Sequence, residues 1–150
     1  MSKNTDYPVT PAVRFLRTHQ IDFEPYIYVY EEHGGTGQFA QLFGVDEHQV
    51  VKTIVLQNEA KKGLVVVMHG DKQISTRNLA RDLGIKHIEP ADPKQANKWT
   101  GYLVGGTTPF GMKTQLPVYV EKSIWDLDKV YINGGKRGLD RKSTRLNSSH

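Results

Sequence analysis

Residues 50–69 read VVKTIVLQNEAKKGLVVVMH, two runs rich in Val, Ile and Leu on either side of a polar segment. Short runs of β-branched residues bounded by polar residues are typical of strands. The polar connection at residues 58–63 is compatible with a hairpin, so we expect strands at residues 50–57 and 64–69 that pair with each other. No other part of the sequence is as strongly strand-like, and the other elements follow on either side of this hairpin.

Helix signals occur at four places around the hairpin. Thr10 can cap a helix and Pro11 fits its first position. Thr36 and Ser75 are expected to cap two further helices, and glycines at 44 and 84 should end them. We therefore expect helices at residues 11–19, 36–43, 75–83 and 92–99, with one more helical turn after Asp46.

Strand signals alternate with these helices. We expect strands at residues 23–30, 85–89, 102–104, 116–121 and 130–133, and Pro25 places the first of them at a sheet edge. Some neighbouring strands are joined by short turns and others by helices. This intermixing predicts one mixed α/β domain, α+β-like, with a mixed sheet or a partly closed barrel flanked by helices.

The composition is that of an ordinary globular domain. The chain has 150 residues, of which 37% are hydrophobic and 24% charged, and this length allows one domain with a sizeable core. No apolar run approaches the roughly 18 residues of a membrane span, and no basic and then apolar leader opens the sequence. Cysteine is absent, which excludes disulfides and thiolate zinc sites. We expect a cytoplasmic protein without a membrane partner.

The last eleven residues, 140–150, read DRKSTRLNSSH and differ from the rest of the chain. They are polar and lack periodicity, and a common sequencing-adapter read translates to the same residues. We therefore expect a domain at residues 1–139, truncated at its C-terminus, followed by a non-native tail with little order. Without Arg141, Lys142, Arg145 and Asp140 the formal charge falls from +4 to +2. A polyanionic partner can then be inferred only from local clusters of charge.

Lys52 is the one charged residue in the strand-like run at residues 50–56. Within a central strand its ammonium would be pressed against apolar side chains, and an unpaired buried charge is costly. A lysine at the mouth of a pocket would suit a phosphate group or the carbonyl of an acyl ester. A lysine on an edge strand, with its ammonium in water, fits the same pattern.

Two glycine-rich segments follow later in the chain. Residues 100–113 read TGYLVGGTTPFGMK, in which Gly105 and Gly106 come directly after the strand predicted at residues 102–104. Glycine in this position indicates a sharp turn or a close approach of the backbone to another group. The two glycines and Thr107 could offer N–H and hydroxyl donors to a ligand, although an ordinary connecting loop has the same composition.

The first of these segments is not a nucleoside-triphosphate P-loop. Gly106 and Gly111 have the required spacing, but Met112 delays Lys113 by one residue and Pro109 removes an N–H. No helix-forming run follows the segment either.

The second segment, residues 133–138, reads NGGKRG and predicts a tight turn. Asn133 and Gly134 would begin this turn, and Lys136 and Arg137 would be displayed on it. The two cations are either solvated or in contact with phosphates, and phosphate contacts weaken in salt. We expect Lys52 and the two glycine-rich segments to frame a pocket for the end of a nucleic acid.

The remaining candidate groups are aromatic. Tyr26, Tyr28 and Tyr30 share one face of the strand predicted at residues 23–30. They could stack nucleic-acid bases, and packing against neighbouring strands explains the pattern equally well. The six histidines show no i, i+4 pair, so we expect no metal site. Neither a GxSxG elbow nor a cysteine supplies a nucleophile, and we expect no cofactor.

Four segments of the chain resemble one family. TPAVRFL (10–16), VVKTIVL (50–56), TGYLVGGTTPFG (100–111) and YINGGKRG (131–138) are similar to the YbaK/ProX family of trans-acting aminoacyl-tRNA deacylases. The resemblance implies a single mixed α/β domain related to the editing domain of prolyl-tRNA synthetases. The implied activity is removal of a wrongly attached amino acid, above all cysteine from tRNA(Pro), by hydrolysis or with help from the substrate's own thiol.

The resemblance also implies roles for particular residues. Lys52 matches the family's essential lysine, and Gly105 matches a glycine whose backbone lines the pocket for the esterified end. Tyr30 matches a pocket tyrosine, with Tyr28 as the alternative. Asn133 stands where the cysteine-removing branch commonly has serine, so the amino acid removed stays open. The implied partner is the 3′ end of an aminoacyl-tRNA, and a prolyl-tRNA synthetase is a second partner to test.

This chemistry agrees with the absence of a catalytic nucleophile in the sequence. An aminoacyl ester needs little activation, so a site can cleave it by orientation and polar backbone groups. Lys52 would then anchor the terminal phosphate or adenosine. Two other interpretations stay open: a non-catalytic module that binds tRNA or a synthetase, and a single-strand binder that uses the three tyrosines.

Overall fold

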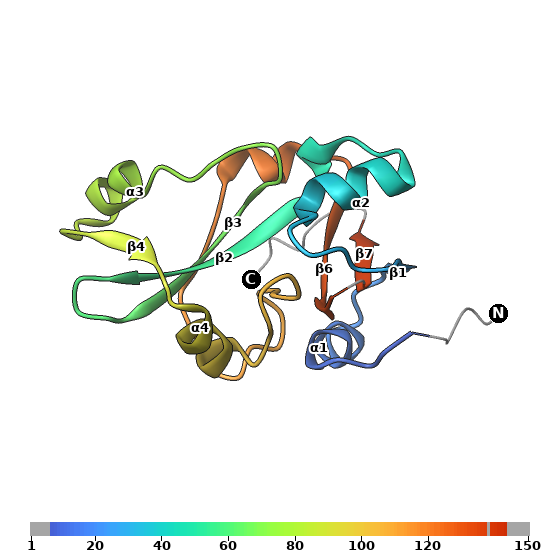
Figure 1. The fold of residues 1–150 in the computed structure, drawn as a ribbon, viewed down its shortest axis with the longest axis horizontal. Helices are drawn as coiled ribbons and strands as arrows, with labels where there is room; N and C mark the ends of the chain where they lie inside the picture. Colours follow the sequence, from blue (N-terminus) through green and yellow to red (C-terminus); the bar gives the residue numbers. More distant parts are fainter. Residues whose placement is uncertain (1–6, 138, 144–150) are drawn as a thin grey trace.

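The hairpin predicted at residues 50–69 forms the middle of the larger of two sheets (Figure 1). The computed structural model describes residues 7–137 and 139–143. The sheet is open and mixed, because its hairpin is extended by an antiparallel strand on one side and a parallel strand on the other. The strand order is β4 (Ile88–Pro90), β2 (Val51–Asn58), β3 (Gly63–His69) and β5 (Val118–Val120).

A second, smaller sheet lies beside the start of the hairpin. It is antiparallel and has the order β1 (Glu24–Ile27), β7 (Leu139–Ser143) and β6 (Val130–Lys136). An isolated parallel bridge between Val50 and Tyr131 joins it to the larger sheet. β1 lies at an edge, which confirms the position predicted from Pro25.

Helices cover both sheets (Figure 1). α3 (Thr76–Leu83) and α4 (Pro93–Thr100) pack on opposite faces of the larger sheet, and α1 (Pro11–Thr18) and α2 (Gly35–Phe43) flank the smaller one. Two short 3₁₀ helices, η1 (Glu47–Gln49) and η2 (Lys122–Asp126), precede β2 and β6. None of the helices in the described chain is long and apolar enough to cross a membrane.

Most of the predicted helix signals act as expected. Thr10 Oγ1 accepts a hydrogen bond from the N–H of Val13, and the hydroxyl of Ser75 caps α3 in the same way. Gly44 and Gly84 end α2 and α3 with φ of 64° and 70°, in the left-handed region that favours glycine.

Thr36, in contrast, does not cap α2 as predicted. Gly34 holds the cap position, and Thr36 lies in the first turn of the helix. Its hydroxyl donates instead to Glu47 Oε2 over 2.7 Å. This contact ties the start of α2 to η1, and sequence pattern could not indicate it because the two residues belong to different elements.

The two faces of the hairpin contribute to different parts of the core. Side chains alternate along a strand, so Leu56 and Val66 face α3 whereas Val55 and Val65 face α4. Two further clusters lie between the sheets and beneath α2: Val51, Val67, Ile124, Val130 and Ile132, and Phe39, Ala40, Val50 and Tyr131. These clusters join both sheets into one unit, which confirms the predicted single mixed α/β domain.

The strand predicted at residues 102–104 is wrong, because residues 101–113 form a loop. Tyr102 is buried and its hydroxyl donates to the carbonyl of Phe110, so it anchors the loop. Leu103 and Val104 are more than half exposed. Their β-propensity has no effect here because, among the described residues, no neighbouring strand offers a ladder to pair with.

The second glycine-rich segment also differs from the prediction. Residues 133–136 belong to β6, and the register shifts between Asn133 and Lys136, as in a β-bulge. Gly135 has φ of 94° and takes the unusual backbone angle of this bulge. The turn itself begins only at Arg137.

The chain keeps regular structure after Leu139. β7 pairs with both β1 and β6, for example Asp140 with Tyr26 and with Asn133. The expectation of little order after Leu139 is therefore wrong for residues 140–143, and residues 144–150 lie outside the described part. Whether residues 140–150 are native stays a prediction.

Candidate functional site

A pocket of about 580 Å³ opens beside β2 at the point where β4 ends. β4 pairs only with residues 56–58 of β2, and the bridge to the smaller sheet is at Val50. The edge of β2 between these points has no strand partner in the described chain. The pocket lies along this edge, and residues 51–55 all line it.

Lys52 lines the pocket from β2. Its side chain is half-buried, and Nζ donates to the carbonyl oxygen of Gly70 over 3.4 Å. Gly70 packs closely against the first turn of α2, where an added Cβ would collide with Thr36 Oγ1. The ammonium thus has one long contact with a fixed carbonyl and remains able to bind an anion or carbonyl in the pocket.

Gly105 lines the pocket opposite β2, and two features require glycine there. Its φ is 91°, which L-residues with a side chain rarely adopt. An added Cβ would also lie 2.5 Å from the hydroxyl of Tyr30 and 3.0 Å from its ring. The close approach that the sequence predicted at Gly105 is therefore made to Tyr30.

The two glycine-rich segments meet and hold each other. Asn133 Nδ2 donates to the carbonyl of Gly105 over 2.8 Å, and Arg137 Nε donates to the carbonyl of Val104 over 2.7 Å. Gly106 packs on the backbone at Arg137, where a Cβ would be 3.1 Å from the amide nitrogen. Their contact forms one wall of the pocket.

Arg137 also braces Tyr30. Its guanidinium carbon lies 5.0 Å from the centre of the Tyr30 ring, in cation–π geometry. Only Nε of Arg137 is hydrogen-bonded in the part of the chain that the structure describes. The two Nη groups are therefore available to a phosphate at the pocket mouth.

The structure brings most of the predicted site residues together. Lys52, Gly105, Tyr28, Tyr30, Thr107, Asn133 and Arg137 line one pocket. Gly106, Gly134 and Lys136 do not line it: Gly106 supports the wall from behind, the carbonyl of Gly134 accepts from Thr10 Oγ1 over 2.6 Å, and Lys136 is exposed.

Two predicted binding groups are already engaged within the protein. The Asn133 amide oxygen accepts from the N–H of Gly135, so both ends of this side chain hold the bulge and the loop. Thr107 Oγ1 donates to the carbonyl of Leu103 over 3.2 Å. These side chains shape the pocket, whatever they contribute to a ligand.

Other residues that the sequence pattern did not single out also line the pocket. Glu32 is the only carboxylate among the described lining residues, and Thr53 carries a hydroxyl without a partner. One end of the pocket is apolar and is formed by Ile54, Val55, Pro90, Ala91, Pro93 and Ala96. Alternation along β2 puts the side chain of Thr53 on the face opposite that of Lys52, so the pattern around Lys52 could not point to it, and the α4 wall depends on tertiary packing.

The three tyrosines at positions 26, 28 and 30 are divided between the core and the pocket. The Tyr26 ring packs edge-on against Phe39, Phe43 and Tyr131. Tyr28 contacts the same two phenylalanines while also lining the pocket, and only Tyr30 reaches the Gly105 loop. Packing therefore explains Tyr26, and a continuous base-stacking face of three tyrosines is not present.

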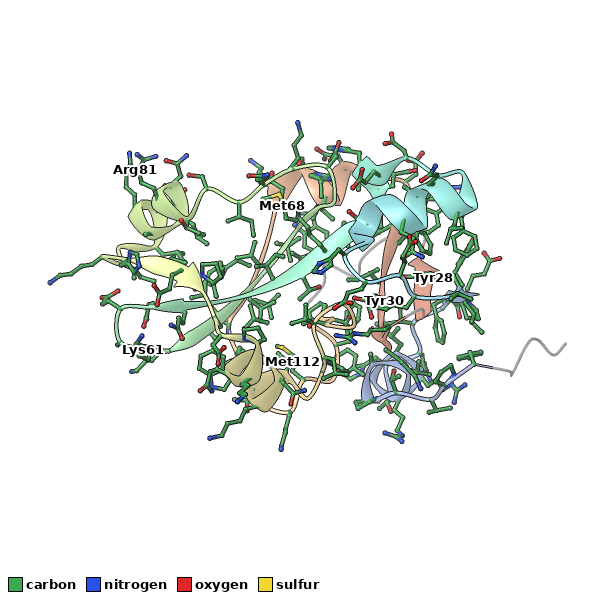
Figure 2. All side chains as sticks on the ribbon, viewed as in Figure 1. Tyr28, Tyr30, Lys61, Met68, Arg81 and Met112 are labelled. Atoms are coloured by element: carbon green, nitrogen blue, oxygen red, sulfur yellow. The ribbon has the colours of Figure 1, made fainter. Side chains whose placement is uncertain are left out.

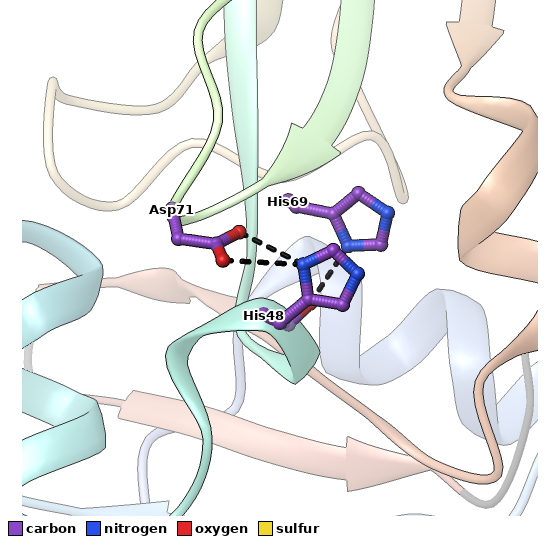
Figure 3. Close-up of side chains that lie close together, drawn as sticks. All are labelled: His48, His69 and Asp71. Carbon is purple, nitrogen blue, oxygen red and sulfur yellow. Dashed lines mark hydrogen bonds and ion pairs between the residues drawn. The ribbon is translucent and has the colours of Figure 1, made fainter.

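His48, His69 and Asp71 form a cluster of side chains (Figure 3), and two of its members flank Gly70 in the sequence. The His48 and His69 rings are stacked 3.7 Å apart at 8°, and His48 Nδ1 lies 2.9 Å from Asp71 Oδ1. This hydrogen bond from His48 holds the pKa of Asp71 below its ordinary value. Sequence spacing missed the cluster because its members come from η1 and from the end of β3.

The same cluster continues through η2. His69 Nδ1 donates to the carbonyl of His48 over 2.7 Å, and His69 Nε2 lies 2.7 Å from Ser123 Oγ. Both ring nitrogens of His69 are therefore engaged within the protein. The cluster fixes the chain around Gly70, whose carbonyl contacts Lys52.

The sequence and the fold have known relatives. EbsC of Enterococcus faecalis (strain ATCC 700802 / V583), named provisionally as a Cys-tRNA(Pro)/Cys-tRNA(Cys) deacylase, is 28% identical over 140 residues, which are 93% of this chain and 85% of EbsC. A proline–tRNA ligase of Brachyspira hyodysenteriae (strain ATCC 49526 / WA1) is 27% identical over 106 residues, 71% of this chain and 18% of the ligase. The crystal structure of the hypothetical protein APE2540 has the same fold, with a TM-score of 0.80, 23% identity and 89% of each chain covered.

A domain family accounts for most of the chain. The aminoacyl-tRNA editing domain family matches residues 33–140, a range that contains β2, both glycine-rich segments and every described pocket residue except Tyr28, Tyr30 and Glu32. This match agrees with the resemblance seen in the sequence motifs and with the shared fold. The chain belongs to the aminoacyl-tRNA editing domain family.

Proposed function

We propose that this chain is an aminoacyl-tRNA deacylase that acts in trans, in the cytoplasm, with cysteine on tRNA(Pro) as its preferred substrate. The observation that carries the proposal is that Lys52, Gly105 and Tyr30 line a single pocket in a member of an editing family. The name of EbsC, which this chain matches over most of both lengths, supports cysteine as the amino acid.

The size of the pocket suits this substrate. Its volume of about 580 Å³ lies within the range of roughly 300–1,000 Å³ that is typical of ligand sites. A terminal adenosine with a small esterified amino acid would occupy such a volume, whereas a folded tRNA would remain outside it. Only the 3′ end of the tRNA would then enter.

The charges in the pocket also suit an aminoacyl ester. Lys52 and Arg137 supply positive charge for the terminal phosphate or the ester carbonyl. Glu32 supplies negative charge, which would complement the α-ammonium group of the amino acid. An aminoacyl-tRNA end carries both signs of charge, and a bare nucleic-acid end carries only one.

The lining residues favour cleavage by positioning. Neither Ser nor Cys is among the described residues of the pocket. Water would attack the ester carbonyl carbon and lose a proton as the carbon–oxygen bond to the ribose breaks, and the leaving ribose oxygen would take up a proton to become a hydroxyl. In a cysteinyl substrate the thiolate would attack the same carbon, and the leaving ribose oxygen would take its proton from water. Lys52 and the polar groups of the loop around Gly105 would hold the ester in the reacting geometry.

The similarity to proline–tRNA ligases supports a prolyl-tRNA synthetase as a second partner. The matched segment is a small part of the ligase, so this chain resembles one portion of that protein. A separate chain of this kind would meet the mischarged tRNA after or during its release from the synthetase.

The proposal is tested by a deacylation panel. Purified protein is incubated with tRNA(Pro) carrying labelled cysteine, alanine, serine or proline, and the loss of label is followed over time. We expect Cys-tRNA(Pro) to be cleared well above its spontaneous rate and Pro-tRNA(Pro) to survive. Binding of the tRNAs without loss of any amino acid would instead support a non-catalytic module.

A further inference from the structure

Thr53 carries a hydroxyl group without a partner in the wall of the pocket. Its Oγ1 is covered from solvent and makes no hydrogen bond in the described chain. Buried hydroxyl groups in native structures nearly always have a partner. Because Thr53 itself lines the pocket, a bound ligand can supply the missing partner after rotation about the Cα–Cβ bond.

Thr53 interrupts an otherwise apolar face of the hairpin. It lies opposite Val67 on β3, between Val51 and Val55 on its own strand. Val51 belongs to the core between the sheets, and Val55 belongs to the core beneath α4. Threonine is the polar isostere of valine, so nothing in the packing requires its hydroxyl.

The backbone of Thr53 faces the pocket as well. The carbonyl of Val55 accepts from the N–H of Ala91, so Val55 turns its backbone groups toward the β4 edge. Backbone groups alternate along a strand, and Thr53, two residues earlier, points the same way. β4 does not reach that far, so the peptide groups at Thr53 are open to a ligand.

The charged and apolar parts of the pocket indicate which part of a substrate meets Thr53. Lys52, Arg137 and the Gly105 loop form the polar part, where the phosphate and ester would bind. Val55, Ala91 and Ala96 form the apolar part, where a small amino acid side chain would fit. Thr53 lies next to Val55, at the border of this apolar part.

We propose, on the basis of the function proposed above, that the Thr53 hydroxyl selects the amino acid. It hydrogen-bonds the thiol or hydroxyl group of an esterified cysteine or serine, and alanine leaves it unpaired. A site built to hydrogen-bond a polar group discriminates against the analogue that lacks this group. One net hydrogen bond corresponds to a preference of roughly five- to tenfold.

Thr53→Val tests this role, and Thr108→Val is its matched control. Thr108 Oγ1 is also buried without a partner, but Thr108 does not line the pocket. Each substitution removes an unpaired hydroxyl and keeps the shape, so neither should lower the melting temperature. Thr53→Ser keeps the hydroxyl and serves as the conservative variant. The readout is the rate of deacylation of Cys-, Ser- and Ala-tRNA(Pro) by each protein.

We expect the wild type, Thr108→Val and Thr53→Ser to favour cysteine and serine over alanine by roughly five- to tenfold. Thr53→Val should clear cysteine and serine at a lower rate, close to that of alanine. An unchanged preference in Thr53→Val, or equal clearance of all three substrates by the wild type, would overturn the role of Thr53 and leave the deacylase intact. Failure of the wild type to clear any substrate would overturn the proposed function together with this role.

Discussion

At the scale of single residues, the site depends on a glycine at position 105 that no residue with a side chain can replace without strain. Gly105 combines a φ of 91° with direct contact to the Tyr30 ring. Tyr30 in turn is covered by Arg137, whose Nε is tied to Val104. A change at Gly105 would therefore move both the loop and the tyrosine that define one wall of the pocket.

Gly105→Ala tests this dependence, with Gly84→Ala as the control. Both substitutions place a Cβ at positive φ, which costs about 1–2 kcal/mol, but Gly84 has open space around it and does not line the pocket. We expect both variants to lose melting temperature, Gly105→Ala more so because its Cβ also meets Tyr30, and we expect a large loss of deacylation only in Gly105→Ala. Equal activity of the two variants would show that the Gly105 loop is not part of the site.

At the scale of elements, β2 organises both the core and the pocket. Residues 56–58 of β2 are flanked by both β3 and β4, whereas the first half of β2 pairs only with β3. The unpaired edge exposes residues 51–55 to the pocket. The end of β3 and the start of η2 support this edge through the Gly70 carbonyl and the His69 hydrogen bonds.

The hydrogen bonds at the start of η2 predict that the stability of the fold depends on pH. The N–H and hydroxyl of Ser123 donate to Glu121, and together with nearby His69 they hold the pKa of this carboxyl below its ordinary value of 4.5. A lowered folded pKa contributes stability that is complete above 4.5 and is lost as the pH falls through the folded value. After solvent screening we expect less than about 1 kcal/mol.

Melting curves between about pH 6 and pH 3 measure this contribution. Glu121→Gln should lose less stability on acidification than the wild type, because its side chain has no charge to lose. Asp126→Asn is the control, since Asp126 is exposed on the same 3₁₀ helix and makes no hydrogen bond or ion pair among the described residues. Parallel acid profiles of the wild type and Glu121→Gln would contradict the assignment.

Local signals in the sequence predicted the elements well, and long-range contacts explain the misses. Thr10, Ser75, Gly44 and Gly84 mark helix ends because capping is a local property. Residues 102–104 were expected to form a strand because strand propensity does not reveal whether a partner is near.

The site residues divide in the same way, into those that local sequence indicates and those that depend on long-range contacts. Lys52 and Gly105 could be singled out because a charge within an apolar strand and a pair of adjacent glycines can be recognised in the sequence itself. The roles of Asn133 and Arg137 as links to the Gly105 loop could not, since each bond spans about thirty residues. Glu32 and the α4 wall reach the pocket only through the tertiary fold.

At the scale of the whole molecule, the pocket is held between the two sheets and the loop at residues 100–113. β6 presents Asn133 to the pocket, and β7 lies between β6 and β1 (Figure 1). Tyr28 and Tyr30 follow β1 in the chain and lie beneath α2 (Figure 2), and both line the pocket. The integrity of the smaller sheet should therefore affect the site.

Truncation tests the contribution of β7. A chain ending at Leu139 loses most of the pairing with β1 and β6, so we expect its melting temperature to fall by several degrees. A chain ending at Ser143 keeps the whole strand and should melt like the full chain. Equal melting of all three chains would instead support the hypothesis that residues 140–150 are dispensable to the fold.

The central claim is that Lys52 acts on an aminoacyl ester bound in this pocket. The most direct measurement is the single-turnover rate of Cys-tRNA(Pro) deacylation by Lys52→Ala beside Lys62→Ala, which removes the same charge from the exposed loop between β2 and β3. We predict a loss of roughly 100-fold or more in Lys52→Ala, with a melting temperature near that of the wild type, and an unchanged rate in Lys62→Ala. A folded Lys52→Ala protein that clears Cys-tRNA(Pro) as fast as the wild type would contradict the claim.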